Sequence, residues 1–321
     1  MKKKIIFAIA LTIALIYFLI SQIDINELKK FLASISPELI LLCFPLYIFS
    51  MLLRTLRFQM LLKMIEFDKI FSIVCIYYLL INILPARTGE LSYIYLLKKI
   101  KKIPLSEGIA TLVITRILDF ITVAVFFLIS FYIISLSLSW FIQSVFLFVA
   151  FMLILLSFIL FLLIYKGKKI ILTIDRITKI LKIKKFKIVK FLLEKLNGIS
   201  ESFGSIDKKS IFYSLVISFL LWFCIFFMMH LLTTGMNTNI GINKLIFVAS
   251  FTILTTTLPI QGIAGFGTYE GAWTIAMLYV GVSKELAIMS GFGIHILNLI
   301  YSIMLSIFGF FRLKIVNFFR R

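Results

Sequence analysis

The sequence predicts an all-α membrane protein that crosses the bilayer several times. Its 321 residues are 62% hydrophobic and only 15% charged, whereas a soluble domain has about 25% charged residues. The apolar residues form long continuous runs without the alternation typical of β-strands. Because only helices and closed barrels satisfy their backbone groups in lipid, these runs favour helices. We predict one integral membrane domain over residues 1–321, with about six full spans plus two re-entrant helical hairpins forming an inverted repeat.

The predicted spans and hairpin limbs follow from the apolar runs. The longer runs are Ile5–Ile20, Glu38–Leu53, Ile70–Leu84, Ile109–Leu138, Trp140–Tyr165, Ile211–Thr234, Leu245–Leu258 and Leu286–Phe311. Two shorter segments, Leu91–Leu97 and Thr268–Val280, follow breaks at Pro85 and Pro259. We interpret Ile5–Ile20 as an uncleaved first span, because no small-x-small cleavage site follows it.

The distribution of cations predicts the orientation. The net charge is +20, and the Lys and Arg residues gather between the apolar runs, which is typical of cytoplasmic loops and does not require nucleic acid as a partner. We expect a bacterial or archaeal inner membrane with both termini in the cytoplasm. Segment 166–209 mixes many cations with apolar residues, which predicts interfacial helices on the anionic leaflet. A solvated connector is the alternative.

The same charge rule predicts two re-entrant hairpins. Segment 70–97 has cytoplasmic charges at both ends, and both ends of segment 245–280 fall outside. Each limb is too short for a comfortable span of about 20 residues. We therefore expect the hairpins to enter from opposite faces and to meet at a midplane site, as in transporters with inverted repeats. Two full crossings in each segment would preserve the same parity.

The first break, Leu84–Glu90, places two charges inside the predicted membrane region. Pro85 ends a helix, and Gly89 is expected to provide unusual backbone angles. Arg87 and Glu90 lie three residues apart and share a helical face. Charges at membrane depth are costly and usually functional, so we predict that both bind substrate. Mutual neutralisation is the alternative.

The second break, between Leu258 and Gly271, is rich in glycine. Glycines at a broken helix expose backbone amides and let a ligand approach closely. We expect Thr268 to cap the returning helix. Helix packing through glycine is the alternative. The predicted substrate-binding residues here are Gln261, Gly265, Gly267, Thr268 and Glu270.

Two further pairs of charged residues are candidate site residues. Arg116 and Asp119 lie three residues apart inside an apolar run, and either form a structural ion pair or contribute to substrate binding. Arg54 and Arg57 follow the second apolar run. We place them in a cytoplasmic connector, where they would contact lipid headgroups at the membrane surface.

No pattern of catalytic or metal-binding residues stands out. His230 and His295 are isolated in the sequence, and the three cysteines lie in apolar runs without a CxxC pair. Isolated histidines are more often packed or hydrogen-bonded than bound to metal. We therefore expect no metal, no cofactor and no enzymatic activity.

Four motifs in order resemble a known family. They are Arg54-x-x-Arg57, the Leu-Pro-x-Arg-x-Gly-Glu stretch Leu84–Glu90, Arg116-x-x-Asp119 and the glycine segment Pro259–Glu270. Together they resemble the membrane domain of lysylphosphatidylglycerol synthases, a flippase-like integral membrane family, over nearly the whole chain. The resemblance implies a domain associated with translocating aminoacylated phosphatidylglycerol. Bifunctional members carry a soluble aminoacyltransferase domain; only Arg312–Arg321 follows the last run here, so we expect no synthase activity.

These observations lead to a flippase-like transporter that translocates a phospholipid or lipid-linked headgroup. Arg87 and the amino ends of the broken helices would attract the phosphate. Glu90 and Glu270 would orient the headgroup or carry a coupling proton. One alternative is an enzyme, or enzyme subunit, of lipid-linked sugar or envelope glycolipid synthesis with Glu90, Asp119 or Glu270 as acid or base. Another is a non-transporting scaffold. The expected partners are membrane lipid and the anionic leaflet surface, together with either a second copy of the chain or an envelope-biosynthesis protein.

Overall fold

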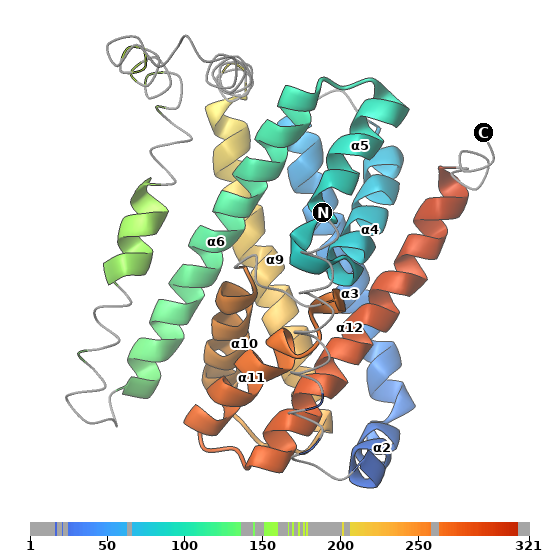
Figure 1. Cartoon of the computed structure of the whole chain (residues 1–321), viewed down its shortest axis with the longest axis vertical. Helices are drawn as coiled ribbons and strands as arrows, with labels where there is room; N and C mark the ends of the chain where they lie inside the picture. The colour runs from blue at the N-terminus through green and yellow to red at the C-terminus, as the bar shows by residue number, and fades with distance from the viewer. Residues whose placement is uncertain are drawn as a thin grey trace.

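A computed structural model of the chain describes residues 17, 21, 25–62, 66–135, 144, 151–159, 166, 169, 173, 176, 178, 201, 206–257 and 263–313. Within these residues all regular structure is helical, and most helices lie along one long axis (Figure 1). The predicted class, an all-α polytopic membrane protein, is confirmed. The runs Ile5–Ile20 and Trp140–Tyr165 and the basic segment 166–209 lie largely outside the described residues.

The main helices fall into two groups of four that share one order of lengths. The first group is α3 (Pro37–Leu62), α4 (Phe67–Ile83), α5 (Glu90–Lys101) and α6 (Leu105–Ser135). The second group is α9 (Lys208–Gly235), α10 (Ile242–Thr256), α11 (Thr268–Tyr279) and α12 (Lys284–Arg312). In each group a long helix is followed by two short helices and a second long helix. A further short helix that the sequence analysis did not predict, α2 (Ile25–Ser34), packs against α12.

The contacts between helices follow the same correspondence. Helix α4 packs on α12 just as α10 packs on α6, and α5 lies on α6 as α11 lies on α12. Helices α3 and α9, the first of each group, contact each other. Figure 1 shows α4 and α5 in the upper half of the molecule and α10 and α11 in the lower half. The packing therefore has the two-fold correspondence that the predicted inverted repeat requires.

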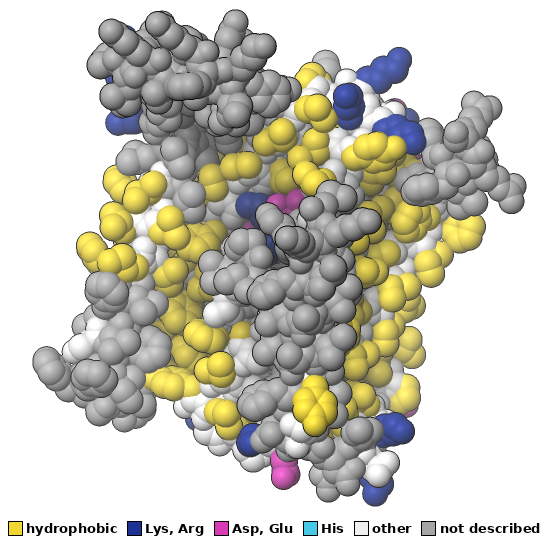
Figure 2. Space-filling model, viewed as in Figure 1, with side chains coloured by type: hydrophobic (Ala, Val, Ile, Leu, Met, Phe, Trp, Pro, Cys, Tyr) yellow, Lys and Arg dark blue, Asp and Glu magenta, His cyan; other side chains and the backbone are white. Residues whose placement is uncertain are grey.

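Four described helices are long and apolar enough to cross a membrane: α3, α6 over Leu105–Ile134, α9 and α12. Helices α4, α5, α10 and α11 have only 17, 12, 15 and 12 residues, fewer than the roughly 20 that a full span needs. Figure 2 shows a broad apolar band across the molecule, with basic side chains at its two ends. This distribution suits a protein surrounded by lipid.

Helix α3 extends well past its predicted end at Leu53. The sequence from Arg54 to Leu62 contains no glycine or proline and consists mainly of good helix formers, so the helix continues to Leu62. The expectation that Arg54 and Arg57 lie in a surface connector is therefore wrong. Both side chains are inside the helical bundle, with 7% and 0% of their surface exposed.

The α4–α5 turn contains η1 (Pro85–Arg87). Leu84 is extended, with ψ 136°, as expected of a residue before proline. The prediction that Gly89 provides an unusual backbone angle is wrong, because its φ is −57° and Arg87 is the residue with a positive φ, 57°. Glycine is required at position 89 for space: a Cβ atom there would lie 2.3 Å from the carbonyl oxygen of Leu80. Close approach of α5 to α4 therefore depends on this glycine.

The turn before α11 contains η3 (Ile263–Gly265). Gly265 and Gly267 have φ values of 73° and 80°, which favour glycine, so the unusual angles expected at Gly89 occur in this turn. Gln261 lies outside the described residues. Elements η1 and η3 contact each other, so the turns of the two hairpins meet inside the bundle.

Substitution of Gly89 by alanine should destabilise the α4–α5 hairpin. The added Cβ would collide with the backbone of Leu80 and Ile81, and overpacking of this kind costs about 1–3 kcal/mol. Gly271→Ala is the matched control, since a Cβ there meets nothing within 4 Å and alanine favours a helix. Thermal unfolding of the purified proteins in detergent measures the stability of both variants relative to wild type. Equal stability of Gly89→Ala and wild type would contradict the close packing of the turn.

Candidate functional site

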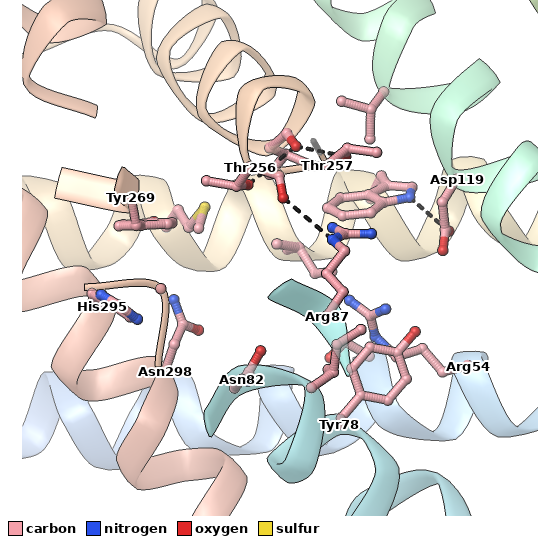
Figure 3. A pocket seen from close by; sticks show the side chains of 18 of the residues that line it. Arg54, Tyr78, Asn82, Arg87, Asp119, Thr256, Thr257, Tyr269, His295 and Asn298 are labelled. Carbon is pink, nitrogen blue, oxygen red and sulfur yellow. Dashed lines mark hydrogen bonds between the residues drawn. The ribbon is translucent and has the colours of Figure 1, made fainter. Parts of the chain in front are cut away.

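A cavity of about 430 Å³ lies where the two hairpin turns meet. Its walls come from both groups of helices, with residues from α3 to α6, from α9 to α12 and from the turns before α5 and α11. Figure 3 shows arginines and aromatic rings at one end, and Tyr269, His295 and Asn298 at the other. In Figure 2, basic and acidic side chains are visible in a hollow within the apolar band. The cavity is therefore a polar site inside an apolar protein.

A buried, multiply hydrogen-bonded ion pair anchors one wall of the cavity. Arg57 donates to both carboxylate oxygens of Asp119, over 2.5 and 3.3 Å, and to the hydroxyl of Ser218 over 2.7 Å. The indole N–H of Trp222 also donates to Asp119, over 2.9 Å. These bonds join α3, α6 and α9. Sequence spacing did not reveal the pair, because its partners are 62 positions apart.

A second carboxylate, Glu90, is shared by two arginines. Its Oε1 atom lies 3.0 Å from Nε of Arg116 and 3.5 Å from Nη1 of Arg87. Arg116 also donates to the hydroxyl of Tyr77 and is 3.8 Å from Asp119. The pairs Arg87–Glu90 and Arg116–Asp119, predicted from a spacing of three residues, therefore exist. Each carboxylate, however, has a shorter contact with a different arginine.

Arg87 also connects the two hairpins. Its Nε donates to the carbonyl oxygen of Thr256 over 3.3 Å, and Thr256 is the last residue of α10. Carbonyl groups at the end of a helix lack a partner within the helix and carry partial negative charge. The cation from the first hairpin therefore stabilises the end of a helix in the second (Figure 3).

Among the arginines that line the cavity, Arg54 is the one that forms no salt bridge in the described residues; its charge acts on Asp119, whose carboxylate is already bound by Arg57. The guanidinium of Arg54 lies over the ring of Tyr78, 4.1 Å from the centroid, and 5.6 Å from that of Trp222. It forms no hydrogen bond or salt bridge within the described part of the chain, and its Nε is buried without a partner. Cation–π contacts stabilise such a group only partly. A buried cation that lines the cavity therefore remains available to an anion.

The predicted residue Glu270 lies behind the cavity wall and is fully buried. Its carboxylate accepts from the N–H of Gly267 over 2.7 Å and lies 2.6 Å from Nδ1 of His295. The expectation that Thr268 caps α11 is wrong: the Glu270 carboxylate binds the N-cap amide, and Thr268 donates to the carbonyl oxygen of Gly265 over 2.9 Å. Glu270 thus positions His295, which lines the cavity.

The structure brings most predicted site residues to this cavity. Those that line it are Arg54, Arg87, Glu90, Arg116, Asp119 and Gly265. Arg57 and Glu270 hold the lining residues from behind. Sequence analysis missed several polar or aromatic lining residues, namely Tyr78, Asn82, Trp222, Tyr269, His295 and Asn298. For the two asparagines a signal exists, because a polar side chain within an apolar run is unusual at membrane depth.

Metal-binding geometry does not occur in the described residues, where no group of three or more His, Cys, Asp or Glu side chains could hold an ion. The site instead combines arginines, carboxylates, amides and aromatic rings. Arginine forks match the geometry of carboxylate and phosphate groups. The chemistry of this end of the cavity therefore suits recognition of an anion.

An apolar helical bundle with four potential spans and a polar internal cavity is a polytopic membrane protein. The family described as lysylphosphatidylglycerol synthase TM region matches residues 5–306, and the chain belongs to this family. The resemblance inferred from the motifs is confirmed, and the family links the protein to the handling of lipids. No curated protein matches the sequence.

Removal of one member of the Arg57–Asp119 pair should destabilise the fold strongly. Asp119→Asn leaves Arg57 as a buried charge without its counterion, which costs about 3–5 kcal/mol. The control is Asp68→Asn, which removes an exposed salt bridge to Arg312 and should cost about 1 kcal/mol or less. The unfolding midpoints of Asp119→Asn and Asp68→Asn in detergent show which substitution destabilises the protein more. The double variant Arg57→Met with Asp119→Leu should be more stable than Asp119→Asn; a less stable double variant would contradict this assignment.

Proposed function

We propose that this protein moves a phospholipid or a lipid-linked headgroup from one leaflet of the inner membrane to the other. The observation that carries the proposal is the buried Arg54, which forms no salt bridge in the described residues, in a cavity where two opposed hairpins meet. Burying a charge without a partner costs several kcal/mol. A bound phosphate would offset this cost, and the phosphate of a lipid is the anion most available to a membrane protein.

The phosphate would bind between Arg54 and Arg87. Arg57 and Arg116 are held by carboxylates at 2.5 and 3.0 Å, whereas Arg87 is 3.5 Å from its carboxylate partner Glu90. Arg87 can therefore exchange a weak contact for a charge-assisted bond to the ligand. Helices α5 and α11 both begin at the turns beside the cavity. Their amino ends add partial positive charge to the same region.

The hairpins would act as two gates. In this proposal η1 and η3 lie near the middle of the bilayer, α4 and α5 close the site toward one face, and α10 and α11 close it toward the other. Because corresponding helices make corresponding contacts, the two groups can exchange roles, which would open the site to each face in turn. The acyl chains would stay in the hydrocarbon while the headgroup crosses the cavity.

Translocation should depend on Arg54. We expect Arg54→Gln to slow the movement of fluorescent phosphatidylglycerol in proteoliposomes about tenfold or more, since a hydrogen bond to a charged group contributes roughly 1.5–3 kcal/mol. Lys98→Gln is the control, because it removes a cation that is exposed on α5. Quenching of the fluorophore in the outer leaflet measures the rate.

Two results of this assay would contradict the proposal. Wild-type protein that moves lipid no faster than empty vesicles would exclude transport under these conditions, and an Arg54→Gln variant as fast as wild type would exclude the phosphate role of Arg54. Mass spectrometry of the recovered lipid separates transport from enzymatic change. A chemically altered lipid would favour the enzyme alternative.

The proposed orientation predicts which side chains are accessible from outside. Lys98, beside the first hairpin's open end, should face the cytoplasm with both termini, and Ser283, beside the second hairpin's open end, should face outward. In a variant without Cys43, Cys75 and Cys224, Ser283→Cys should react with an impermeant maleimide on intact cells. Lys98→Cys should react only after permeabilisation. The reverse pattern would show that the orientation is inverted.

A further inference from the structure

The two ends of the cavity differ in chemistry (Figure 3). From this difference we infer that the cavity selects a phosphodiester lipid with an uncharged, hydroxyl-rich headgroup over one with a cationic, aminoacylated headgroup. The inference rests on the transport function proposed above and specifies its substrate. Arginines form the phosphate end of the cavity, and neutral hydrogen-bonding groups form the headgroup end.

The phosphate end carries more positive than negative charge. Four arginines gather there, at positions 54, 57, 87 and 116, against the two carboxylates Glu90 and Asp119. Two positive charges are unbalanced, and a phosphodiester neutralises one of them. A headgroup that itself carries ammonium groups would face the remaining positive charge. Since like charges repel more strongly inside a protein than in bulk water, the cationic headgroup is disfavoured.

The carboxylates that could receive an ammonium group are already engaged. Asp119 accepts from Arg57 and Trp222, and Glu90 lies between two arginines. Glu270 is fully buried and bonded to Gly267 and His295. Within the described residues, the cavity therefore presents no carboxylate that an ammonium group could bind without breaking an existing ion pair or helix cap.

The headgroup end instead offers neutral donors and acceptors. The amides of Asn82 and Asn298 line the cavity and make no hydrogen bond within the described residues. The hydroxyl of Tyr269, another lining residue, is buried without a partner in the same part of the chain. Polar groups without partners in a buried site favour a ligand that supplies them.

Two more residues add neutral groups to the cavity wall, Thr257 near Arg87 and His295 at the headgroup end (Figure 3). Thr257 donates its hydroxyl proton to the carbonyl oxygen of Ile253, so its oxygen keeps acceptor capacity for a ligand hydroxyl. Nδ1 of His295 lies 2.6 Å from the Glu270 carboxylate; in the tautomer that donates from Nδ1 to this carboxylate, Nε2 is an acceptor. Hydroxyl groups both donate and accept, so a polyol can satisfy the amides, the tyrosine and these acceptors together. An ammonium group can only donate.

Competition between defined lipids tests the inference. Purified protein is mixed with equal amounts of phosphatidylglycerol, phosphatidylinositol and lysyl-phosphatidylglycerol, and native mass spectrometry measures which lipid stays bound. We expect phosphatidylglycerol or phosphatidylinositol to exceed the lysyl lipid about tenfold, since one charge-assisted contact is worth at least 1.4 kcal/mol. The first two lipids distinguish a glycerol headgroup from a ring polyol.

An isosteric variant makes the test sharper. Asn298→Asp adds a carboxylate at the headgroup end and should shift the ratio toward the lysyl lipid by about tenfold. Asn237→Asp is the matched control, because Asn237 is exposed in the connection between α9 and α10 and should leave the ratio unchanged. If the lysyl lipid binds wild type as well as or better than phosphatidylglycerol and phosphatidylinositol, or if the ratio is unchanged in Asn298→Asp, the inference about selectivity is overturned and the proposed transport function is not affected. Binding of none of the three lipids would overturn the proposed transport function as well.

Discussion

The structure depends on how an apolar bundle holds four arginines, of which Arg54 and Arg57 are buried and Arg87 and Arg116 are half-buried. Taking a guanidinium out of water costs several kcal/mol, and geometry and partners must recover that cost. Arg57 achieves this with Asp119 and Ser218, and these bonds join α3, α6 and α9. Arg87 binds Thr256 at the end of α10 and so links the two hairpins. The long helices and hairpin turns are therefore connected through the charges that the site uses.

The two groups of helices pack in corresponding ways, but they contribute different kinds of side chain to the cavity. All four arginines come from the first group of helices and its hairpin turn. The second group contributes Thr257, Tyr269, His295 and Asn298, which provide hydrogen bonds without an exposed carboxylate. A repeated fold with different residues in each half can bind the two parts of one ligand differently. The account of lipid selectivity follows from this division.

The sequence revealed what depends on local chemistry. Pro85 and the glycines around Gly265 predict breaks in helices, and the breaks occur at those places because proline and positive φ angles act within a few residues. The long apolar runs predict the long helices for the same reason. The order of long and short helices then predicts the correspondence between the two groups.

Contacts between distant residues could not be predicted in this way. Arg54 and Arg57 looked like surface cations, since arginines after an apolar run usually mark a loop; here the helix continues and a carboxylate on α6 compensates Arg57. His295 gained its role only through Glu270, which lies 25 positions away. The requirement for glycine at position 89 comes from the neighbouring helix rather than from its own φ angle.

The most direct measurement of the central claim is an experimental structure of the protein in nanodiscs that contain phosphatidylglycerol. The account predicts a lipid phosphate within hydrogen-bond distance of Arg54 and Arg87, between the two hairpin turns, with the headgroup directed toward Asn298 and His295. A cavity without a lipid headgroup, with Arg54 still stacked on Tyr78 and lipids bound only around the outer surface, would contradict it.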